Sequence, residues 1–282
     1  MIERIAVIGA GTMGHGIAAV AAMAGSQVAL ADSDPVACAA AMIRIGSTLD
    51  KAIERGKLAA ADRAEVLGRV RAAADVADAA RDAGLVIEAI PERLDLKQAL
   101  FAELERHAPA AAILATNTSS LSVSSIADAV SEPGRVVGLH FFNPVPAMRL
   151  VEIVRGQATS DDTIAAASAF AESLGKTPIV VRDSPGFATS RLGVVLGLEA
   201  IRMLEEGVAS ADDIDRAMEL GYNHPMGPLR LGDIVGLDVR LAIADHLHAT
   251  LGGDTYVAPA LLRRMVAEGR LGRKSGQGFY QW

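Results

Sequence analysis

An imidazole and a carboxylate lie twelve positions apart in the largely apolar stretch "LHFFNPVPAMRLVEIV", residues 139–154. His140 ends one β-rich run, and Glu152 lies within the next. The loop between the two runs contains two prolines, and a return of the chain there can bring Glu152 to the imidazole. A carboxylate on one ring nitrogen fixes the tautomer and stabilises the imidazolium, so the other nitrogen can act as a base. The stretch therefore predicts either a catalytic pair or a histidine satisfied within the core.

A glycine-rich segment, "GAGTMG", follows the first β-rich run and has the G-x-G-x-x-G spacing. Gly9 permits a tight turn, Gly11 lets the backbone approach a pyrophosphate, and Gly14 lets the next helix pack on the strand. Thr12 and Met13 open that helix, whose N-terminus supplies N–H groups for an anion. Because a strand precedes the motif and a helix follows it, we expect a dinucleotide site rather than a simple turn.

An acidic residue stands where the ribose of such a ligand would lie. The second β-rich run, residues 28–31, leads directly into Asp32. A carboxylate there accepts hydrogen bonds from the ribose hydroxyls and repels a 2′-phosphate. The sequence therefore favours NAD over NADP.

Four polar residues, Asn117, Thr118, Ser119 and Ser120, follow the β-rich run at residues 113–115. Ligands of parallel sheets bind at the carboxyl ends of the strands, so these side chains are well placed to hydrogen-bond one. A turn and helix cap is the alternative, and for any single one of them it is the better interpretation.

Short β-rich runs alternate with helical stretches through the first part of the chain. The runs span residues 5–8, 28–31, 85–89, 113–115, 136–140, 150–154 and 179–181, and residues 35–56 have the pattern of one long helix. This alternation predicts an α/β fold with a doubly wound, mainly parallel, Rossmann-like sheet, whose last runs can include antiparallel members.

The pattern changes at "RDSPGF", residues 182–187. After it, helical spacing occurs near residues 187–206, 211–220, 237–251 and 260–267, with Gly and Pro between the segments. We therefore predict two domains, a Rossmann-like domain over residues 1–183 and an all-helical domain over residues 184–282.

The composition excludes several classes of function. The chain has 282 residues and a formal net charge of −7, which disfavours binding to nucleic acid or an anionic membrane. Its one cysteine, Cys38, rules out an internal disulfide or a cysteine-rich metal site and fits a reducing compartment, so we expect a cytoplasmic protein without a metal. The most apolar region, residues 17–31, is too short and too polar to span a bilayer.

Several motifs together resemble a known family. "GAGTMG", "NTSSLS", "GLHFFNPVPAMRLVEIV", "DSPGF", "NHPMGP" and "GRKSGQGFY" are similar to segments of the short-chain L-3-hydroxyacyl-CoA dehydrogenases, which include bacterial 3-hydroxybutyryl-CoA dehydrogenases. The resemblance extends from the first strand to the last residues. It implies an NAD-binding domain followed by a helical substrate domain that forms a homodimer, with His140 as the catalytic base and Glu152 as its orienting partner.

The same resemblance implies contacts to NAD. The implied residues, beside the glycine loop, are Asp32, Glu92, Lys97, Ser119, Asn143 and Lys274. Ser119 would also touch the substrate. Without the resemblance, Glu92 and Lys97 have the pattern of solvated charges, and Lys274 that of a surface turn.

One position departs from the family pattern. The family usually has Asn-Arg after the "PGF" helix start, and that Asn helps to hold the substrate, whereas this chain has Ser190 in "GFATSRL". Serine is shorter and has one hydroxyl in place of an amide donor and acceptor. The departure bears on rate and substrate geometry more than on the type of reaction.

The phosphates of coenzyme A require local positive charge in an acidic protein. Lys51 and Arg55 lie four residues apart on one helix face, with Thr48 one turn before, and the family places its CoA contacts on this helix. A solvated helix face is the alternative.

The sequence therefore predicts an NAD-dependent oxidoreductase of fatty acid metabolism that interconverts an L-3-hydroxyacyl-CoA and a 3-ketoacyl-CoA. His140 would move the proton, and Ser119, helped by Ser190, would orient the substrate oxygens. Two other functions stay open: a related dehydrogenase acting on a sugar acid such as gulonate, and a non-catalytic NAD-binding structural protein.

Overall fold

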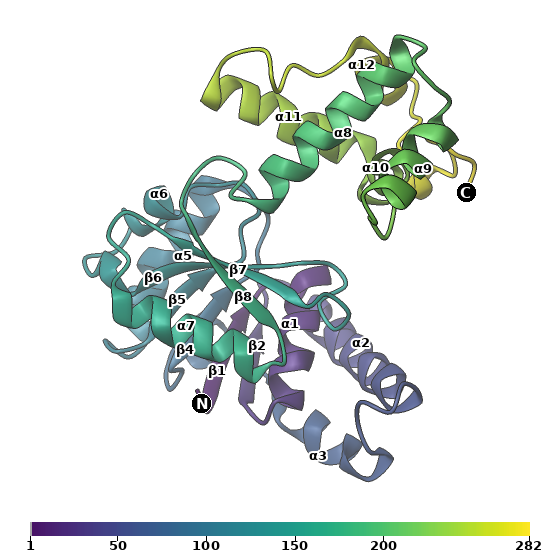
Figure 1. Cartoon of the computed structure of the whole chain (residues 1–282). Helices are drawn as coiled ribbons and strands as arrows, with labels where there is room; N and C mark the ends of the chain where they lie inside the picture. Colours follow the sequence, from purple (N-terminus) through teal and green to yellow (C-terminus); the bar gives the residue numbers. More distant parts are fainter. Residues whose placement is uncertain (1) are drawn as a thin grey trace. The chain divides into compact units, whose positions relative to one another are not determined.

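The structure is a computed structural model that describes residues 2–282, and its chain divides into two compact units, Met1–Ser184 and Pro185–Trp282 (Figure 1). Within the described residues, eight strands of the first unit form one sheet in the order β3-β2-β1-β4-β5-β6-β7-β8. The strands are β1 (Arg4–Ile8), β2 (Gln27–Ala31), β3 (Val70–Ala72), β4 (Leu85–Glu88), β5 (Ile113–Thr116), β6 (Val136–Phe141), β7 (Leu150–Arg155) and β8 (Thr177–Arg182).

All neighbouring strands are parallel except β6 and β7, which are antiparallel. The central strands carry Val, Ile, Leu and Ala almost without interruption, because helices cover both faces of a parallel sheet. β3 is not among the predicted strands, and two of its three residues are exposed. So short a run has no hydrophobic period of its own, and only its pairing with β2 makes it a strand.

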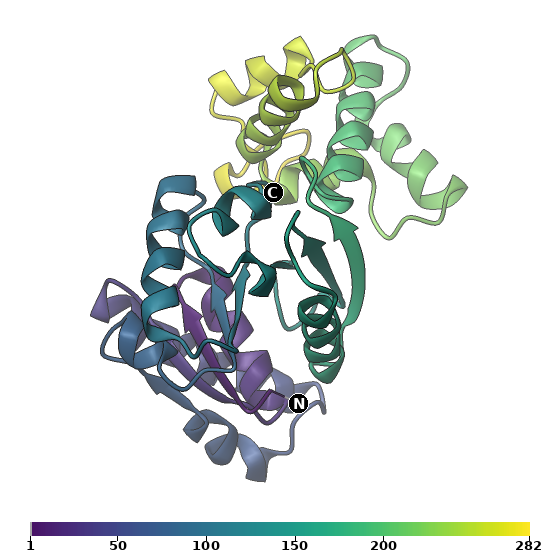
Figure 2. The ribbon, with the colours of Figure 1, turned by 90° about the vertical axis from the view of Figure 1, so that its left-hand side faces the viewer.

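Helices of the first unit cover the two faces of the sheet, with α5 and α7 on opposite sides (Figure 2). They are α1 (Thr12–Met23), α2 (Pro35–Glu54), α3 (Arg63–Gly68), α4 (Val76–Ala80), α5 (Leu94–His107), α6 (Val123–Ala127) and α7 (Asp161–Ser173). One core cluster joins alternate strand residues such as Val7 and Ile87 to Ile17 of α1, Ile45 of α2 and Phe170 of α7.

The strand order places the candidate site. β1 lies between β2 and β4, so the chain leaves the sheet in opposite directions from the carboxyl ends of β1 and β4. A crevice forms at such a switch point, and ligands of open α/β sheets bind there. The loops after β1, β2, β4, β5 and β6 all emerge at this edge because these strands are parallel.

The second unit is helical, with α8 (Thr189–Glu205), α9 (Ala211–Gly221), α10 (Pro228–Val235), α11 (Leu237–Leu251) and α12 (Ala260–Ala267). Two buried aspartates hold it together. The Asp233 carboxylate accepts hydrogen bonds from the backbone of Phe279 and Tyr280 and from the indole of Trp282, which docks the C-terminal residues. Asp215 accepts the Leu229 N–H at the start of α10 and the Tyr280 hydroxyl.

No helix within residues 2–282 is both long enough and apolar enough to cross a membrane. The same residues contain no group of three His, Cys, Asp or Glu side chains arranged to hold a metal ion.

Candidate active site

The glycine loop joins β1 to α1. Gly9 has φ of +103°, and a Cβ there would lie 2.5 Å from the carbonyl oxygen of Ala89, so the turn and the close approach both require glycine. A Cβ on Gly14 would lie 1.7 Å from the Gly9 carbonyl oxygen. A Cβ on Gly11 would instead meet no atom within 4 Å, and because Gly11 is the N-cap residue of α1, no side-chain hydrogen bond caps this helix. The loop therefore leaves room, and helix N–H donors, for a pyrophosphate.

Asp32 lies beside this loop. Its Oδ2 accepts the backbone N–H of Ala10 at 2.7 Å, and its Oδ1 accepts that of Asp34 at 3.0 Å. The carboxylate thereby fixes the glycine loop to the end of β2. An ionised carboxylate has about four acceptor positions, so hydrogen bonds to ribose hydroxyls remain available to it.

A buried ion-pair network lies where β4 and β5 end. Lys97 is 1% exposed, and its Nζ is 2.5 Å from Glu88 Oε1 and 3.4 Å from Glu92 Oε2. Glu88 also accepts the hydroxyl of Thr116 at 2.6 Å. The alternative interpretation of Lys97 as a solvated charge is wrong, because two carboxylates that lie close only in the folded chain allow the ammonium to be buried.

Glu92 organises the serine loop after β5. Its Oε1 accepts the Thr118 hydroxyl at 2.7 Å and the backbone N–H groups of Ser119 at 2.8 Å and Ser120 at 3.1 Å. Burial raises the pKa of Glu92, but the charge of Lys97 and these hydrogen bonds outweigh it and hold the pKa below its ordinary value. Ser119 Oγ is 3.2 Å from the same carboxylate oxygen, so the network fixes both the backbone and the hydroxyl of Ser119.

The structure brings His140 and Glu152 together. The two residues are opposite each other in the antiparallel β6–β7 pair, and His140 Nδ1 is 2.7 Å from Glu152 Oε2. Glu152 is fully buried, the His140 residue is 6% exposed, and the imidazole packs against Phe142 with ring centroids 4.4 Å apart. Asn117 holds the end of β6 through its Oδ1, which accepts the Phe141 N–H at 2.9 Å. Asn117 thus fixes the end of the strand that carries the imidazole.

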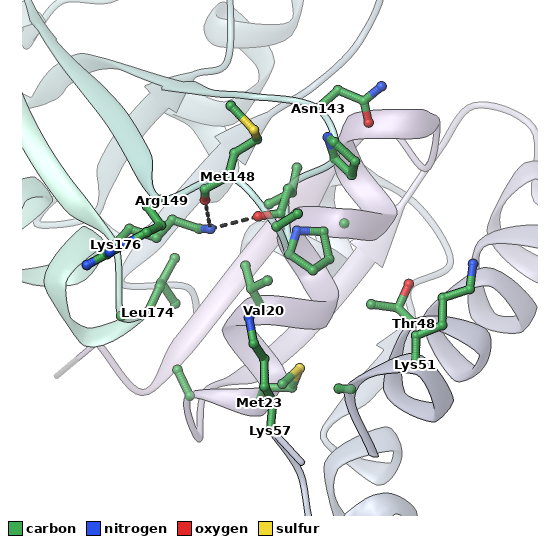
Figure 3. A pocket seen from close by; sticks show the side chains of 18 of the residues that line it. Val20, Met23, Thr48, Lys51, Lys57, Asn143, Met148, Arg149, Leu174 and Lys176 are labelled. Carbon is green, nitrogen blue, oxygen red and sulfur yellow. Dashed lines mark hydrogen bonds between the residues drawn. The ribbon is translucent and has the colours of Figure 1, made fainter. Parts of the chain in front are cut away.

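A cavity of about 720 Å³ lies in the first unit between α1, α2 and the loop from β6 to β7 (Figure 3). Thr48, Lys51 and Arg55 line it on the α2 side, and Thr12 and Asn143 also line it. Its ionisable lining residues are His15, Lys51, Arg55, Lys57, Arg149 and Lys176. Within this lining, which lies wholly in the described part of the chain, no residue is acidic.

Two of the predicted site residues lie in the second unit. Ser190 is the second residue of α8. Lys274 follows a turn at Gly272 and forms an ion pair with Asp238, with 2.6 Å between Nζ and Oδ2. The backbone of Asp233 packs so closely against this segment that a Cβ on Gly272 would lie 2.2 Å from the Asp233 carbonyl oxygen.

Sequence reasoning missed two groups that shape the site. Glu88 ends the apolar strand β4, and Lys176 lies in the turn between α7 and β8. Each is buried against polar atoms from distant parts of the chain. Their only signal in the sequence is a charged residue next to an apolar run, which is also common at the surface.

Comparisons with known proteins agree with this arrangement. Residues 4–184 match the family described as 3-hydroxyacyl-CoA dehydrogenase, NAD binding domain, and residues 186–282 match 3-hydroxyacyl-CoA dehydrogenase, C-terminal domain. The chain is 45% identical to a probable 3-hydroxybutyryl-CoA dehydrogenase of Bacillus subtilis, over 100% of this chain and 98% of the relative. It is 46% identical to a protein of the same description from Deinococcus radiodurans, over 99% of this chain and 100% of the relative.

The fold is similar over its whole length to that of a solved structure. The (S)-3-hydroxybutyryl-CoA dehydrogenase of Ralstonia eutropha superposes with a TM-score of 0.96 at 41% identity, covering 100% of this chain and 99% of that one. Two family models account for nearly every residue, so the resemblance seen in the motifs extends to the whole fold. The chain therefore belongs to the 3-hydroxyacyl-CoA dehydrogenase family, and its first unit is the family's NAD-binding domain.

Proposed function

We propose that this protein interconverts an L-3-hydroxyacyl-CoA, of which 3-hydroxybutyryl-CoA is the best candidate, and the 3-ketoacyl-CoA, with NAD as the redox partner. The observation that carries the proposal is the 2.7 Å contact between His140 Nδ1 and Glu152 Oε2 at the carboxyl edge of a dinucleotide-binding sheet. The names of the relatives at 45% and 46% identity support the same substrate class.

The residues present fit NAD. The open space at Gly11 and the N–H groups of α1 suit the pyrophosphate, and Asp32 lies where the ribose hydroxyls of an adenosine would reach it. NAD⁺, when bound, supplies the chemistry by accepting the hydride from C3 of the substrate. Glu92, Lys97, Ser119, Asn143 and Lys274 are proposed as further contacts to the cofactor.

His140 moves the proton. Because Nδ1 is bonded to Glu152, transfer with the substrate falls to Nε2, which takes the proton from the C3 hydroxyl as the C3–H bond breaks and the C3=O bond forms. The Glu152 carboxylate holds the ring and stabilises the imidazolium. In the reverse direction, Nε2 returns the proton to the oxygen. Ser119, whose hydroxyl donates to Glu92, keeps lone pairs that accept the C3 hydroxyl of the substrate, and Ser190 supplies a second hydroxyl.

The basic cavity is proposed as the site of the CoA phosphates. Five cationic side chains line it in a protein whose net charge is −7, and no acidic residue opposes them there. A solvated helix face explains Lys51 and Arg55 alone, but it does not explain why Lys57, Arg149 and Lys176 come from other segments to the same cavity. Local positive charge of this kind attracts a polyanion to an acidic protein.

A homodimer through the helical unit is also proposed. That unit exposes large apolar side chains on several helices, among them Leu192 at 68%, Leu231 at 40% and Val235 at 43%. Leu231 and Val235 are one turn apart on α10 and so share a face. Burial of such side chains against a second copy is favourable. Sedimentation of the wild type and of a Leu192→Glu, Leu231→Glu variant tests this, because the variant should shift to monomers.

Turnover of acetoacetyl-CoA with NADH is the deciding experiment for the reaction. Oxidation of NADH is expected with the CoA ester and not with free acetoacetate, since the phosphates supply binding energy at the cavity. Oxidation of gulonate with NAD⁺ in place of this reaction would overturn the acyl-CoA assignment. Binding of NADH without turnover of any of these compounds would favour a structural protein.

A further inference from the structure

The loop from β6 to β7, residues 142–149, forms one wall of the basic cavity, and α2 forms the other. The loop begins immediately after the strand that carries His140. Most of its residues are exposed, but Val145 is only 2% exposed and packs on α1, where a Cβ on Gly16 would lie 3.0 Å from the Val145 Cβ. An exposed loop that lines a ligand cavity must be held by a few anchors, and Val145 is one of them.

Lys176 is a second anchor. It lies in the turn between α7 and β8 and is 8% exposed, and its Nζ donates to the carbonyl oxygens of Val145 and Met148, each at 2.7 Å (Figure 3). The two carbonyls belong to the same loop and lie three residues apart, so one ammonium group links two points of the loop. A shorter or apolar side chain at this position cannot bridge both carbonyls.

The burial of this ammonium is unusual because no carboxylate accompanies it. Among residues 2–282 no Asp or Glu forms an ion pair with Lys176, and the neighbouring charge that acts on it is another cation, Lys57. Burial and then the charge of Lys57 lower the pKa of Lys176. A methionine would fill a similar volume without the desolvation of a charge, so the two carbonyl contacts, rather than packing, account for a lysine here.

We propose that Lys176 is a positioning residue that fixes the 142–149 loop as a wall of the acyl-CoA cavity and acts through the two loop carbonyls. It thereby sets the width of the cavity between the loop and α2. His140 and Glu152 lie in paired strands outside this loop, so the contact between them is held by the strand register and not by Lys176. The loop reaches the imidazole through Phe142, which packs on the ring. The inference rests on the proposed function only for the identity of the ligand.

Three variants separate this role from a simple charge effect. Lys176→Met removes the bridge and the charge, Lys57→Met removes a charge from the same cavity and leaves the bridge, and Val145→Ala loosens the loop and leaves every charge. Each is compared with the wild type in the KM and kcat for acetoacetyl-CoA at low and high ionic strength. Hydrogen exchange of residues 142–149 is measured on the same preparations without substrate.

Lys176→Met is expected to raise the KM about tenfold, the effect of losing one or two hydrogen bonds to a charged group, while kcat stays within about threefold. Its KM defect should persist at high ionic strength, because a buried bridge is poorly screened, whereas the Lys57→Met defect should shrink. Val145→Ala should raise the KM in the same sense. Residues 142–149 should exchange faster in Lys176→Met and Val145→Ala and at the wild-type rate in Lys57→Met.

The proposal is overturned if Lys176→Met exchanges like the wild type over residues 142–149, or if its KM defect vanishes with salt as that of Lys57→Met does. Should Lys176→Met not fold, Lys176→Gln takes its place: a shorter neutral donor should give a smaller change in the same direction, and no change would contradict the proposal. A wild type that does not turn over acetoacetyl-CoA would refute the proposed function, while the exchange measurement would still test the bridge.

Discussion

His140 and Glu152 are opposite residues of the only antiparallel strand pair within the described sheet, with Nδ1 2.7 Å from Oε2. Side chains at directly opposed positions lie on the same face of a sheet, about 5 Å apart at Cβ. The carboxylate therefore meets the ring without a flexible segment between them. Two buried polar groups with this geometry can form a catalytic pair or a tether between strands, and mutation separates the two.

His140→Ala should lower kcat by about 100- to 10,000-fold, because it removes proton transfer. Glu152→Gln should also lower kcat strongly, since it keeps the shape but loses the charge that stabilises the imidazolium. The double variant should be little worse than His140→Ala, because residues that act as a unit are not additive. A structural tether predicts the opposite result, a lowered Tm with kcat retained in the folded fraction, so both quantities are measured on one preparation.

Replacement of Lys51 and Arg55 by Ala should raise the KM for acetoacetyl-CoA by about tenfold at low ionic strength, if each contact contributes near the upper range for exposed charges. The Kd for NADH should change little, because the three glycines of the loop and Asp32 do not line the cavity that contains Lys51 and Arg55. Arg81→Ala, at an exposed arginine outside the cavity, serves as the matched control for the loss of charge. An unchanged KM in the double variant would contradict a role of Lys51 and Arg55 in CoA binding and would favour the alternative, a solvated helix face.

Asp32 should make the enzyme prefer NADH to NADPH by about tenfold or more in kcat/KM, because its carboxylate repels a 2′-phosphate. Asp32→Ala should narrow this preference, although loss of the 2.7 Å bond to Ala10 should weaken the binding of both cofactors. Asp34→Ala is the control, since Asp34 caps α2 through the Val36 N–H. Equal kcat/KM values for the two cofactors in the wild type would contradict the assignment.

Ser190→Asn should keep or raise kcat/KM for acetoacetyl-CoA. The amide reaches further than the hydroxyl and offers both a donor and an acceptor to the substrate. Ser190→Ala, which removes the hydroxyl without adding volume, should lower kcat/KM. A large loss in Ser190→Asn would instead mean that the site is built around the smaller residue.

Glu92 should contribute to stability in a pH-dependent way. Its pKa is lower in the folded chain than the ordinary value of about 4.3, so its stabilising effect is present above that value and is lost as the pH falls through the folded pKa. The difference in unfolding free energy between the wild type and Glu92→Gln should therefore be constant near neutral pH and shrink below about pH 4. Denaturant titrations across this range measure it, and a difference that does not depend on pH would disprove the linkage.

The local signals of the sequence determined the parts of the fold whose residues are near one another. The glycine spacing, the acid after β2 and the apolar runs predicted the Rossmann-like sheet, which the structure and the family comparisons confirm. The sequence did not predict helix α10, because its Pro228 and Gly232 are residues typical of loops. Proline is tolerated at the first position of a helix, and the Leu229 N–H of the first turn is capped by Asp215, fourteen residues before it in the chain.

Burial of charge was decided by the tertiary structure alone. Lys97 and Lys176 look alike in the sequence, as charges beside apolar segments, yet the first is neutralised by Glu88 and Glu92 and the second is held by two loop carbonyls. Whether an ionisable group can leave water depends on partners that the fold brings from elsewhere in the chain, and no periodicity in the sequence encodes them. The spacing of His140 and Glu152 allowed a contact, but only the antiparallel register of β6 and β7 made them opposite residues.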